Sequence, residues 1–172
     1  MTALSTLVQD NAEYAVAAVF LLGFAESLVL VALFVPSTVF FAGIGATYAA
    51  AGGTLEALWV AGALGATAGD TLSFGLGRYF RDDAAKRWPL NQFPDLITRG
   101  ERLFAAWGWL AIVISKFAFG LRPFVPVVAG IVAMPVVRFL AASAISCVIW
   151  AGSALGLGYA ATIVVRRAFG SF

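Results

Sequence analysis

The residues from Phe139 to Val165 read FLAASAISCVIWAGSALGLGYAATIVV, and this stretch of 27 residues contains no Asp, Glu, Lys or Arg. An α-helix that crosses a bilayer needs about 20 predominantly apolar residues. The stretch therefore predicts a membrane-spanning helix. Two further stretches, Ala57–Gly77 and Leu103–Leu121, are apolar around one ionisable residue each, and we predict that they also span.

A fourth apolar stretch, Ser27–Leu55, is uncharged but contains Pro36 and four glycines. Proline and glycine interrupt helices, so we predict a half-span, a break and a second segment here. The composition agrees with a membrane protein. Of the 172 residues, 62% are hydrophobic and 12% are charged, whereas soluble domains have about 45–50% and about 25%. We predict one all-α polytopic membrane domain over residues 1–172.

Several function classes are disfavoured by what the sequence lacks. It contains no histidine, so Ser-His-Asp triads, His-based zinc sites and the commonest general base are excluded. It has no Gly-x4-Gly-Lys-[Ser/Thr] phosphate loop. The net charge of +2 gives no indication of a nucleic-acid partner. We therefore expect no enzyme activity, no metal and no cofactor. We also expect no cleaved secretory signal, because the first 20 residues contain no Lys or Arg.

The polar residues concentrate in the region 78–102, which we predict to be a loop or a short surface helix. Trp88, Trp107 and Trp109 flank it, as aromatic residues at a membrane interface would. The positive-inside rule places this region and the Arg166–Arg167 tail in the cytoplasm. An even number of crossings must then separate them. The last two spanning stretches would supply these crossings, with a proline-containing segment dipping in and out between them.

That proline-containing segment has a counterpart earlier in the chain. Pro36-Ser-Thr-Val-Phe-Phe-Ala-Gly43-Ile and Pro123-Phe-Val-Pro-Val-Val-Ala-Gly130-Ile share the pattern Pro-x5-Ala-Gly-Ile at a distance of 87 residues. Paired interrupted segments in two halves of a chain point to a transport site between repeats. We predict an inverted repeat with two re-entrant hairpins that face each other and break at Pro36, Gly43, Pro123, Pro126 and Gly130. The alternative is two ordinary kinked helices.

Four ionisable residues lie within or beside the apolar stretches: Glu26, Asp70, Lys116 and Arg122. A charge at the centre of a membrane helix costs about 2.5–3.5 kcal/mol even on insertion scales, so these groups must pair, snorkel or line an aqueous cavity. One interpretation is a structural ion-pair network. The other is a polar cavity in which Lys116 and Arg122 hold an anionic phosphate head group, while Glu26 and Asp70 balance the charge and carry protons.

The small residues Gly65-x3-Gly69 and Gly152-x3-Gly156 allow helices to approach closely. They fit packing within one chain, and a homodimer is the alternative. Cys147 is the single cysteine and lies in an apolar run, so we predict a small buried filler.

An ordered set of motifs extends from about residue 26 to residue 159. It consists of Glu26-Ser27, Val35-Pro36-Ser37, Ala42-Gly43, Gly65-x3-Gly69-Asp70, Gly77-Arg78-Tyr79, Trp107-Gly108, Ser-Lys116-Phe-x2-Gly-Leu-Arg122, Pro126, Ala129-Gly130, Phe139 and Trp150. This set resembles the DedA family, also called the VTT or SNARE-associated domain family. The resemblance implies facing re-entrant hairpins and the movement of lipids such as undecaprenyl phosphate or phosphatidylethanolamine between leaflets, in some members driven by the proton motive force.

The functional residues of that family carry over unevenly. Glu26 matches the membrane glutamate, and Arg122 matches the second arginine of the Arg-Phe-x-Pro-Gly-x-Arg stretch. Lys116 replaces the first arginine and Phe119 replaces the proline. Thr38 stands where many members have an acid. Lysine keeps the charge but loses the bidentate geometry toward phosphate, which favours a different lipid, and the missing acid puts proton coupling in question.

We therefore expect a flippase or scramblase for a phosphate-bearing lipid in a bacterial cytoplasmic membrane. Its partners would be membrane lipids, recognised by their phosphate head groups. Two alternatives stay open: a proton-coupled transporter of small solutes or ions, and a membrane scaffold that transports nothing.

Overall fold

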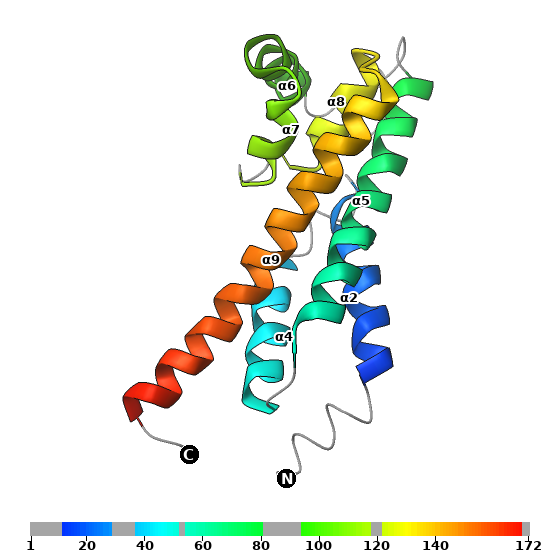
Figure 1. Ribbon diagram of the computed structural model, residues 1–172. Coiled ribbons are helices and arrows are strands. Elements are labelled where there is room, and N and C mark those ends of the chain that lie inside the picture. Colours follow the sequence, from blue (N-terminus) through cyan, green and yellow to red (C-terminus); the bar gives the residue numbers. More distant parts are fainter. Residues whose placement is uncertain (1–11, 29–36, 52–53, 81–93, 118–121, 170–172) are drawn as a thin grey trace.

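A computed structural model describes residues 12–28, 37–51, 54–80, 94–117 and 122–169 (Figure 1). The regular elements in these ranges are all α-helices. They are α2 (Ala12–Glu26), α4 (Ser37–Ala51), α5 (Glu56–Tyr79), α6 (Pro94–Trp107), α7 (Leu110–Ser115), α8 (Phe124–Ile131) and α9 (Val136–Phe169).

Two long helices, α5 and α9, form the centre of the bundle and run in opposite directions (Figure 1). The shorter helices pack on them in pairs: α2 and α4 at one end, α7 and α8 at the other. Helix α5 contacts α2, α8 and α9, whereas α9 contacts α4, α5 and α7. Each long helix therefore supports short helices at both ends of the bundle.

The prediction that the stretches Ala57–Gly77 and Phe139–Val165 are helical is confirmed for α5 and α9, whereas a membrane crossing by α5 stays a prediction. Helix α9 has 34 residues and contains the whole uncharged stretch. Within the described ranges, Val136–Ala168 is the one helix that is both long and apolar enough to cross a membrane. Helix α5 has 24 residues and keeps its single central acid on a buried face.

The prediction that Leu103–Leu121 forms one crossing is wrong. Helix α6 ends at Trp107, and Gly108 adopts a left-handed conformation with φ of +54°. This conformation commonly terminates helices and favours glycine. The next helix, α7, has six residues and is therefore about 9 Å long, which is too short to span a bilayer of about 30 Å.

Glycines bring the helices into backbone contact. A β-carbon at Gly65 or Gly69 would collide with carbonyl oxygens of α2, so this Gly-x3-Gly pair packs within the chain. A β-carbon at Gly158 would collide with a carbonyl of α4, and one at Gly77 would collide with a carbonyl of α8. Gly156 differs, since nothing lies within 4 Å of the position of its missing β-carbon.

Two apolar clusters fill the bundle. One lies toward α2 and α4 and includes Phe41 and Trp150, whose ring centroids are 4.7 Å apart. The other lies toward α7 and α8 and includes Phe74 stacked on Phe139 at 4.2 Å. Asp70 lies on α5 one turn from each cluster, which places it at the boundary between them.

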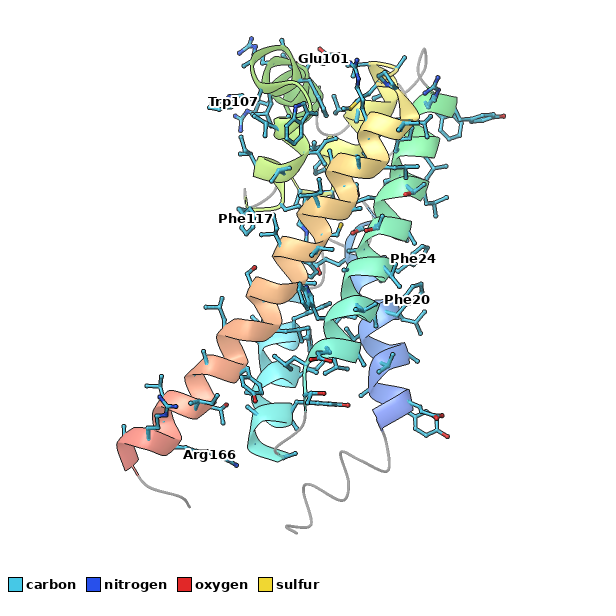
Figure 2. All side chains as sticks on the ribbon, viewed as in Figure 1. Phe20, Phe24, Glu101, Trp107, Phe117 and Arg166 are labelled. Atoms are coloured by element: carbon cyan, nitrogen blue, oxygen red, sulfur yellow. The ribbon has the colours of Figure 1, made fainter. Side chains whose placement is uncertain are left out.

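The two basic regions lie at opposite ends of the bundle. Figure 2 shows Glu101 and Trp107 of α6 at one end and Arg166 of α9 at the other. The expectation that the polar region and the arginine tail share one side is therefore wrong. The reason is that the α7–α8 segment stays at the α6 end, so α9 alone traverses the bundle between these regions. Residues 81–93 of the polar region lie outside the described ranges.

Candidate functional site

The structure places the four ionisable residues of the apolar stretches in two ion pairs at the centre of the bundle. In the first pair, the Nζ atom of Lys116 lies 2.8 Å from Oδ1 and 2.7 Å from Oδ2 of Asp70. Both side chains are 1% exposed. Ser143 donates a hydrogen bond of 2.7 Å to Oδ2, and the Sγ atom of Cys147 lies 3.5 Å from the same oxygen. The Asp70 carboxylate is thus bonded on both oxygens.

The second pair joins Glu26 to Arg122. Nη1 of Arg122 donates to Oε1 of Glu26. The guanidinium also lies over the ring of Trp150, with 3.8 Å between its central carbon and the ring centroid. A guanidinium over an indole face gains cation–π attraction, which is larger when the pair is removed from water. The Arg122 side chain is 11% exposed, so this pair is less enclosed than the first.

Three of the four charges lie at or just beyond the ends of short helices. Glu26 is the last residue of α2, Lys116 follows α7, and Arg122 stands two positions before α8. Asp70 alone lies inside a long helix. The end of α2 is held on α5 because Ser73 donates a hydrogen bond of 2.9 Å to the carbonyl of Ser27. Helix ends therefore bring residues that are far apart in the sequence to one place.

The residues predicted as hairpin breaks have mixed outcomes. Pro36 lies outside the described residues. Pro123 is the N-cap of α8 and Pro126 lies in its first turn, where the missing N–H of proline is tolerated. Gly43 and Gly130, however, lie inside continuous helices and do not break them. Gly130 instead allows close packing, because a β-carbon there would lie 2.6 Å from the backbone nitrogen of Arg78.

Three side chains that complete the site were not predicted as site residues: Ser143, Cys147 and Trp150. All three come from α9 and are buried. Cys147 was predicted as a filler, and it is buried as expected but also contacts Asp70. The available signal was the spacing of Ser143 and Cys147, because residues four apart lie on one face of a helix. Two polar groups on one face of an apolar helix indicate a polar neighbour.

Some buried polar atoms have no hydrogen-bond partner in the part of the chain that the structure describes. They include Nε and Nη2 of Arg122, Oγ of Ser27 and the hydroxyl of Tyr48. Leaving such a group unsatisfied costs about 1–3 kcal/mol. Two of these atoms belong to one guanidinium, so the polar interior retains capacity to bind an acceptor. The described residues contain no group of three or more Cys, Asp or Glu side chains that could hold a metal.

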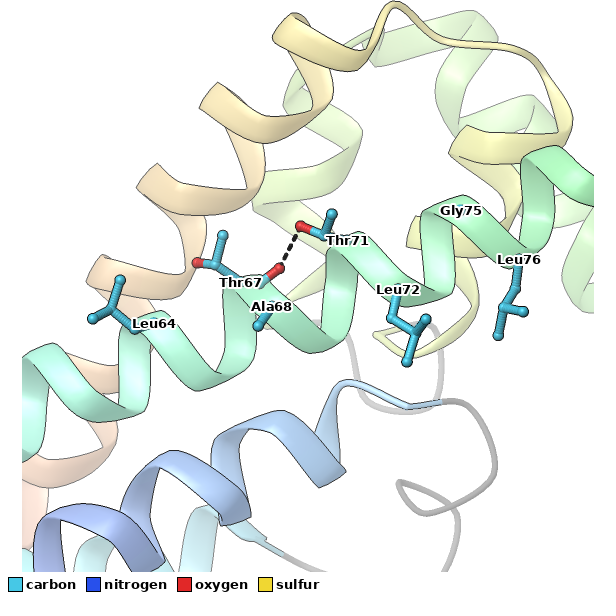
Figure 3. A pocket seen from close by; sticks show the side chains of 7 residues that line it. All are labelled: Leu64, Thr67, Ala68, Thr71, Leu72, Gly75 and Leu76. Carbon is cyan, nitrogen blue, oxygen red and sulfur yellow. Dashed lines mark hydrogen bonds between the residues drawn. The ribbon is translucent and has the colours of Figure 1, made fainter.

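Three apolar grooves among the described residues have linings that do not include the four residues of the ion pairs. One groove follows the outer face of α5 (Figure 3). It is lined by Leu64, Thr67, Ala68, Thr71, Leu72, Gly75 and Leu76. The two threonine hydroxyls donate to carbonyls of their own helix, at 2.7 Å each, so the groove presents chiefly apolar surface. Figure 2 likewise shows Phe117 at the edge of the bundle, and its side chain is 59% exposed.

Residues 35–160 match the model of the VTT domain. The chain belongs to the VTT domain family, also called the DedA family. This match covers all of α5 and α9 as far as residue 160. It includes three of the four residues of the ion pairs, namely Asp70, Lys116 and Arg122, and it begins nine residues after Glu26.

The relatives are bacterial membrane proteins. The inner membrane protein YabI of Escherichia coli (strain K12) is 34% identical over 148 residues, which is 86% of this chain and 58% of YabI. An uncharacterized membrane protein of Buchnera aphidicola subsp. Schizaphis graminum is 27% identical over 147 residues, again 86% of this chain and 58% of the relative. The uncharacterized membrane protein Mb2670 of Mycobacterium bovis is 36% identical over 111 residues, 62% of this chain and 51% of the relative.

The chain thus spans about half the length of the curated relatives that it matches. No solved structure matches it. Family membership and these relatives identify a membrane protein. The exposed Leu, Val, Ile and Phe side chains around α5 and α9 are accordingly a surface suited to lipid rather than to water.

Proposed function

We propose that this protein moves a lipid with a phosphate head group, such as undecaprenyl phosphate or phosphatidylethanolamine, between the leaflets of a bacterial cytoplasmic membrane. The observation that carries the proposal is the presence of two cations and two carboxylates in the buried centre of a membrane protein. Ionisable residues inside membrane proteins mark substrate or ion pathways more often than not. The relative YabI is named an inner membrane protein, which supports the location.

In this proposal, Lys116 and Arg122 supply the positive charge that attracts the phosphate. Asp70 and Glu26 neutralise that charge while the site is empty, which agrees with the pairs described above. The acyl or prenyl tails remain in the bilayer, where apolar grooves such as the one along α5 accommodate them. Because all four charges are enclosed, a head group reaches them only by displacing some of the packing around the site. Glu26 and Asp70 are the groups that would carry protons if the transport is coupled to a gradient.

Pseudo-symmetric contacts support an inverted repeat with two re-entrant hairpins, α2–α4 and α7–α8. Arg78, near the end of α5, donates a hydrogen bond of 3.3 Å to the carbonyl of Met134, just beyond α8. Arg166, near the end of α9, donates to the carbonyl of Ala50 at the end of α4. Each long helix thus holds the second arm of the hairpin from the other half. Such an exchange is expected where two repeats face each other around a central site.

A second candidate function is that of a membrane scaffold that transports nothing. The specific observation in its favour is the first ion pair, in which the carboxylate of Asp70 is bonded on both oxygens and closed off. Such a pair serves to hold helices together without any substrate. A homodimer also stays a prediction, and the open space at Gly156 is where a second helix would approach.

The test is head-group translocation in proteoliposomes that contain the purified full chain. Labelled phosphatidylethanolamine and a short-chain polyprenyl phosphate are assayed in parallel. We expect one of them to move faster than in empty vesicles, and Arg122→Ala and Glu26→Gln to abolish the movement. Arg138→Ala is the matched control, because Arg138 is exposed at the start of α9.

Other results would redirect the proposal. If neither lipid moves but an imposed pH gradient collapses, the protein is an ion-coupled transporter. If neither lipid nor protons move, and the charge-swapped variant D70K/K116D folds while each single substitution does not, the scaffold function is favoured.

A further inference from the structure

The two buried ion pairs differ in how completely their polar atoms are bonded. Lys116 contacts both oxygens of Asp70, and two donors on α9 complete the shell of that carboxylate. Both partners are 1% exposed. Because the Lys116 ammonium already contacts both oxygens of Asp70 and is enclosed, it offers a phosphate at most one N–H group and no pair of parallel donors. This pair and its hydrogen bonds connect three helices, α5, α9 and the end of α7, so its role is to hold these helices together.

Arg122 is bonded on one side only. Its Nη1 atom is held by Glu26, whereas Nε and Nη2 are buried and have no partner among the described residues. Nε and Nη2 lie on the same edge of a guanidinium, and their N–H groups point in parallel. This edge is the one that binds a carboxylate or phosphate with two parallel hydrogen bonds.

The orientation of that edge is fixed before any ligand arrives. Trp150 lies against the face of the guanidinium at 3.8 Å and sets its plane. Glu26 holds Nη1 and sets the rotation within that plane. A ligand on the Nε–Nη2 edge would therefore bind without displacing Glu26 and without reorienting the arginine. It would also satisfy two buried donors that otherwise carry a desolvation cost.

We infer that the Nε–Nη2 edge of Arg122 is the direct binding site for a phosphate oxyanion, and that Lys116 remains paired with Asp70. This inference rests on the proposed function and gives different roles to the two cations named there. Arg122 contacts the oxyanion, whereas Lys116 contributes long-range positive charge and holds the helices in place. The ligand is a phosphate ester of a lipid or inorganic phosphate, since both present the same pair of oxygens.

The test uses two substitutions that keep the charge and change only its geometry. Arg122→Lys removes the fork, and Lys116→Arg introduces one. The purified full chain is titrated with phosphatidic acid, with diacylglycerol of the same acyl chains as the lipid without phosphate, and with inorganic phosphate. Bound ligand is counted by native mass spectrometry. Melting of each variant shows that it is folded.

We expect the wild type to prefer phosphatidic acid to diacylglycerol and Arg122→Lys to weaken that binding by roughly tenfold or more, because a charge-assisted hydrogen bond is lost. Lys116→Arg should stay within about threefold of the wild type. If Arg122→Lys also loses binding of inorganic phosphate, the site recognises the phosphate group by itself. If Arg122→Lys loses binding of phosphatidic acid only, the site recognises the phosphate as part of a lipid.

The inference is overturned if Arg122→Lys binds phosphatidic acid as tightly as the wild type, or if Lys116→Arg alters the affinity as much as Arg122→Lys does. Its failure is separable from failure of the transport proposal. Binding that depends on Arg122 with no lipid movement in proteoliposomes retains the site and removes the transport function. Lipid movement that Arg122→Lys leaves unchanged retains the function and removes the site.

Discussion

Neutralising Asp70 leaves the buried ammonium of Lys116 without its counter-charge. Both side chains are 1% exposed, so solvent does not compensate for the loss. Removing one partner of a buried ion pair costs about 3–5 kcal/mol. For a protein of this size, 1 kcal/mol shifts the melting temperature by about 2–4 °C, so Asp70→Asn should lower it by about 6–20 °C. Lys116→Met should have an effect of similar size, because it leaves a buried carboxylate.

The double variant D70N/K116M contains no buried charge from this pair. Replacing both partners of a buried ion pair is often nearly neutral for stability. We therefore expect the double variant to lose about 1–2 kcal/mol of stability, which lowers its melting temperature by about 2–8 °C relative to the wild type. Coupling between the two substitutions should therefore exceed about 2 kcal/mol. The assay is thermal unfolding in detergent followed with a thiol-reactive fluorescent dye. Cys147 is the one cysteine of the sequence and is buried, so it reacts as the chain unfolds.

Glu101→Gln is the control, because Glu101 is exposed on α6 and surface substitutions usually change stability by less than about 0.5 kcal/mol. Two results would refute the reasoning about the Asp70–Lys116 ion pair. One is a single substitution at Asp70 that costs no more than the control. The other is a double variant whose loss equals the sum of the two single losses, because additive losses mean that the residues are not coupled.

Three further predictions concern packing and placement. Gly158→Ala should lower the melting temperature, because its β-carbon would collide with the backbone of α4. Gly156→Ala on the same helix should be neutral or should stabilise the protein by up to about 1 kcal/mol, as helix propensity predicts. Equal melting temperatures of the two variants would contradict this prediction. In a Cys147→Ser background, cysteines at Glu101 and at Arg167, which is next to Arg166 in the last turn of α9, should be labelled by an impermeant maleimide from opposite sides of the membrane; labelling of both from one side would contradict the arrangement of the bundle. In the folded wild type, Cys147 should stay unlabelled in detergent until the protein melts.

The long helices could be predicted from the sequence because their signal is local. An uncharged run of 27 residues gives α9 directly, and a run with one acid gives α5. The stretch Leu103–Leu121 carries the same signal but does not form one helix. Its interruption depends on the conformation of Gly108, which composition does not report. The length of an apolar stretch therefore predicts that the stretch is apolar enough to lie in lipid, but it does not predict where a helix ends.

The charged residues could also be found from the sequence, whereas their pairing could not. A charge in an apolar run indicates that a partner exists, and Asp70 and Lys116 were both identified in this way. Which cation meets which acid is decided by packing, because Asp70 is 46 residues from Lys116 and Glu26 is 96 residues from Arg122. The partners on α9 depend on the same packing, which glycine contacts set and which no local pattern encodes.

The apolar stretch of helix α9 is longer than the hydrocarbon core of a bilayer is thick. The 27 residues Phe139–Val165 extend about 40 Å, against a hydrocarbon core of about 30 Å. Such hydrophobic mismatch is relieved by helix tilt or by local thickening of the bilayer, and both depend on lipid chain length. The same helix provides Ser143 and Cys147 to one ion pair and Trp150 to the other. We therefore expect a change in the tilt of α9, such as a thinner or thicker bilayer would cause, to act on both buried ion pairs at once.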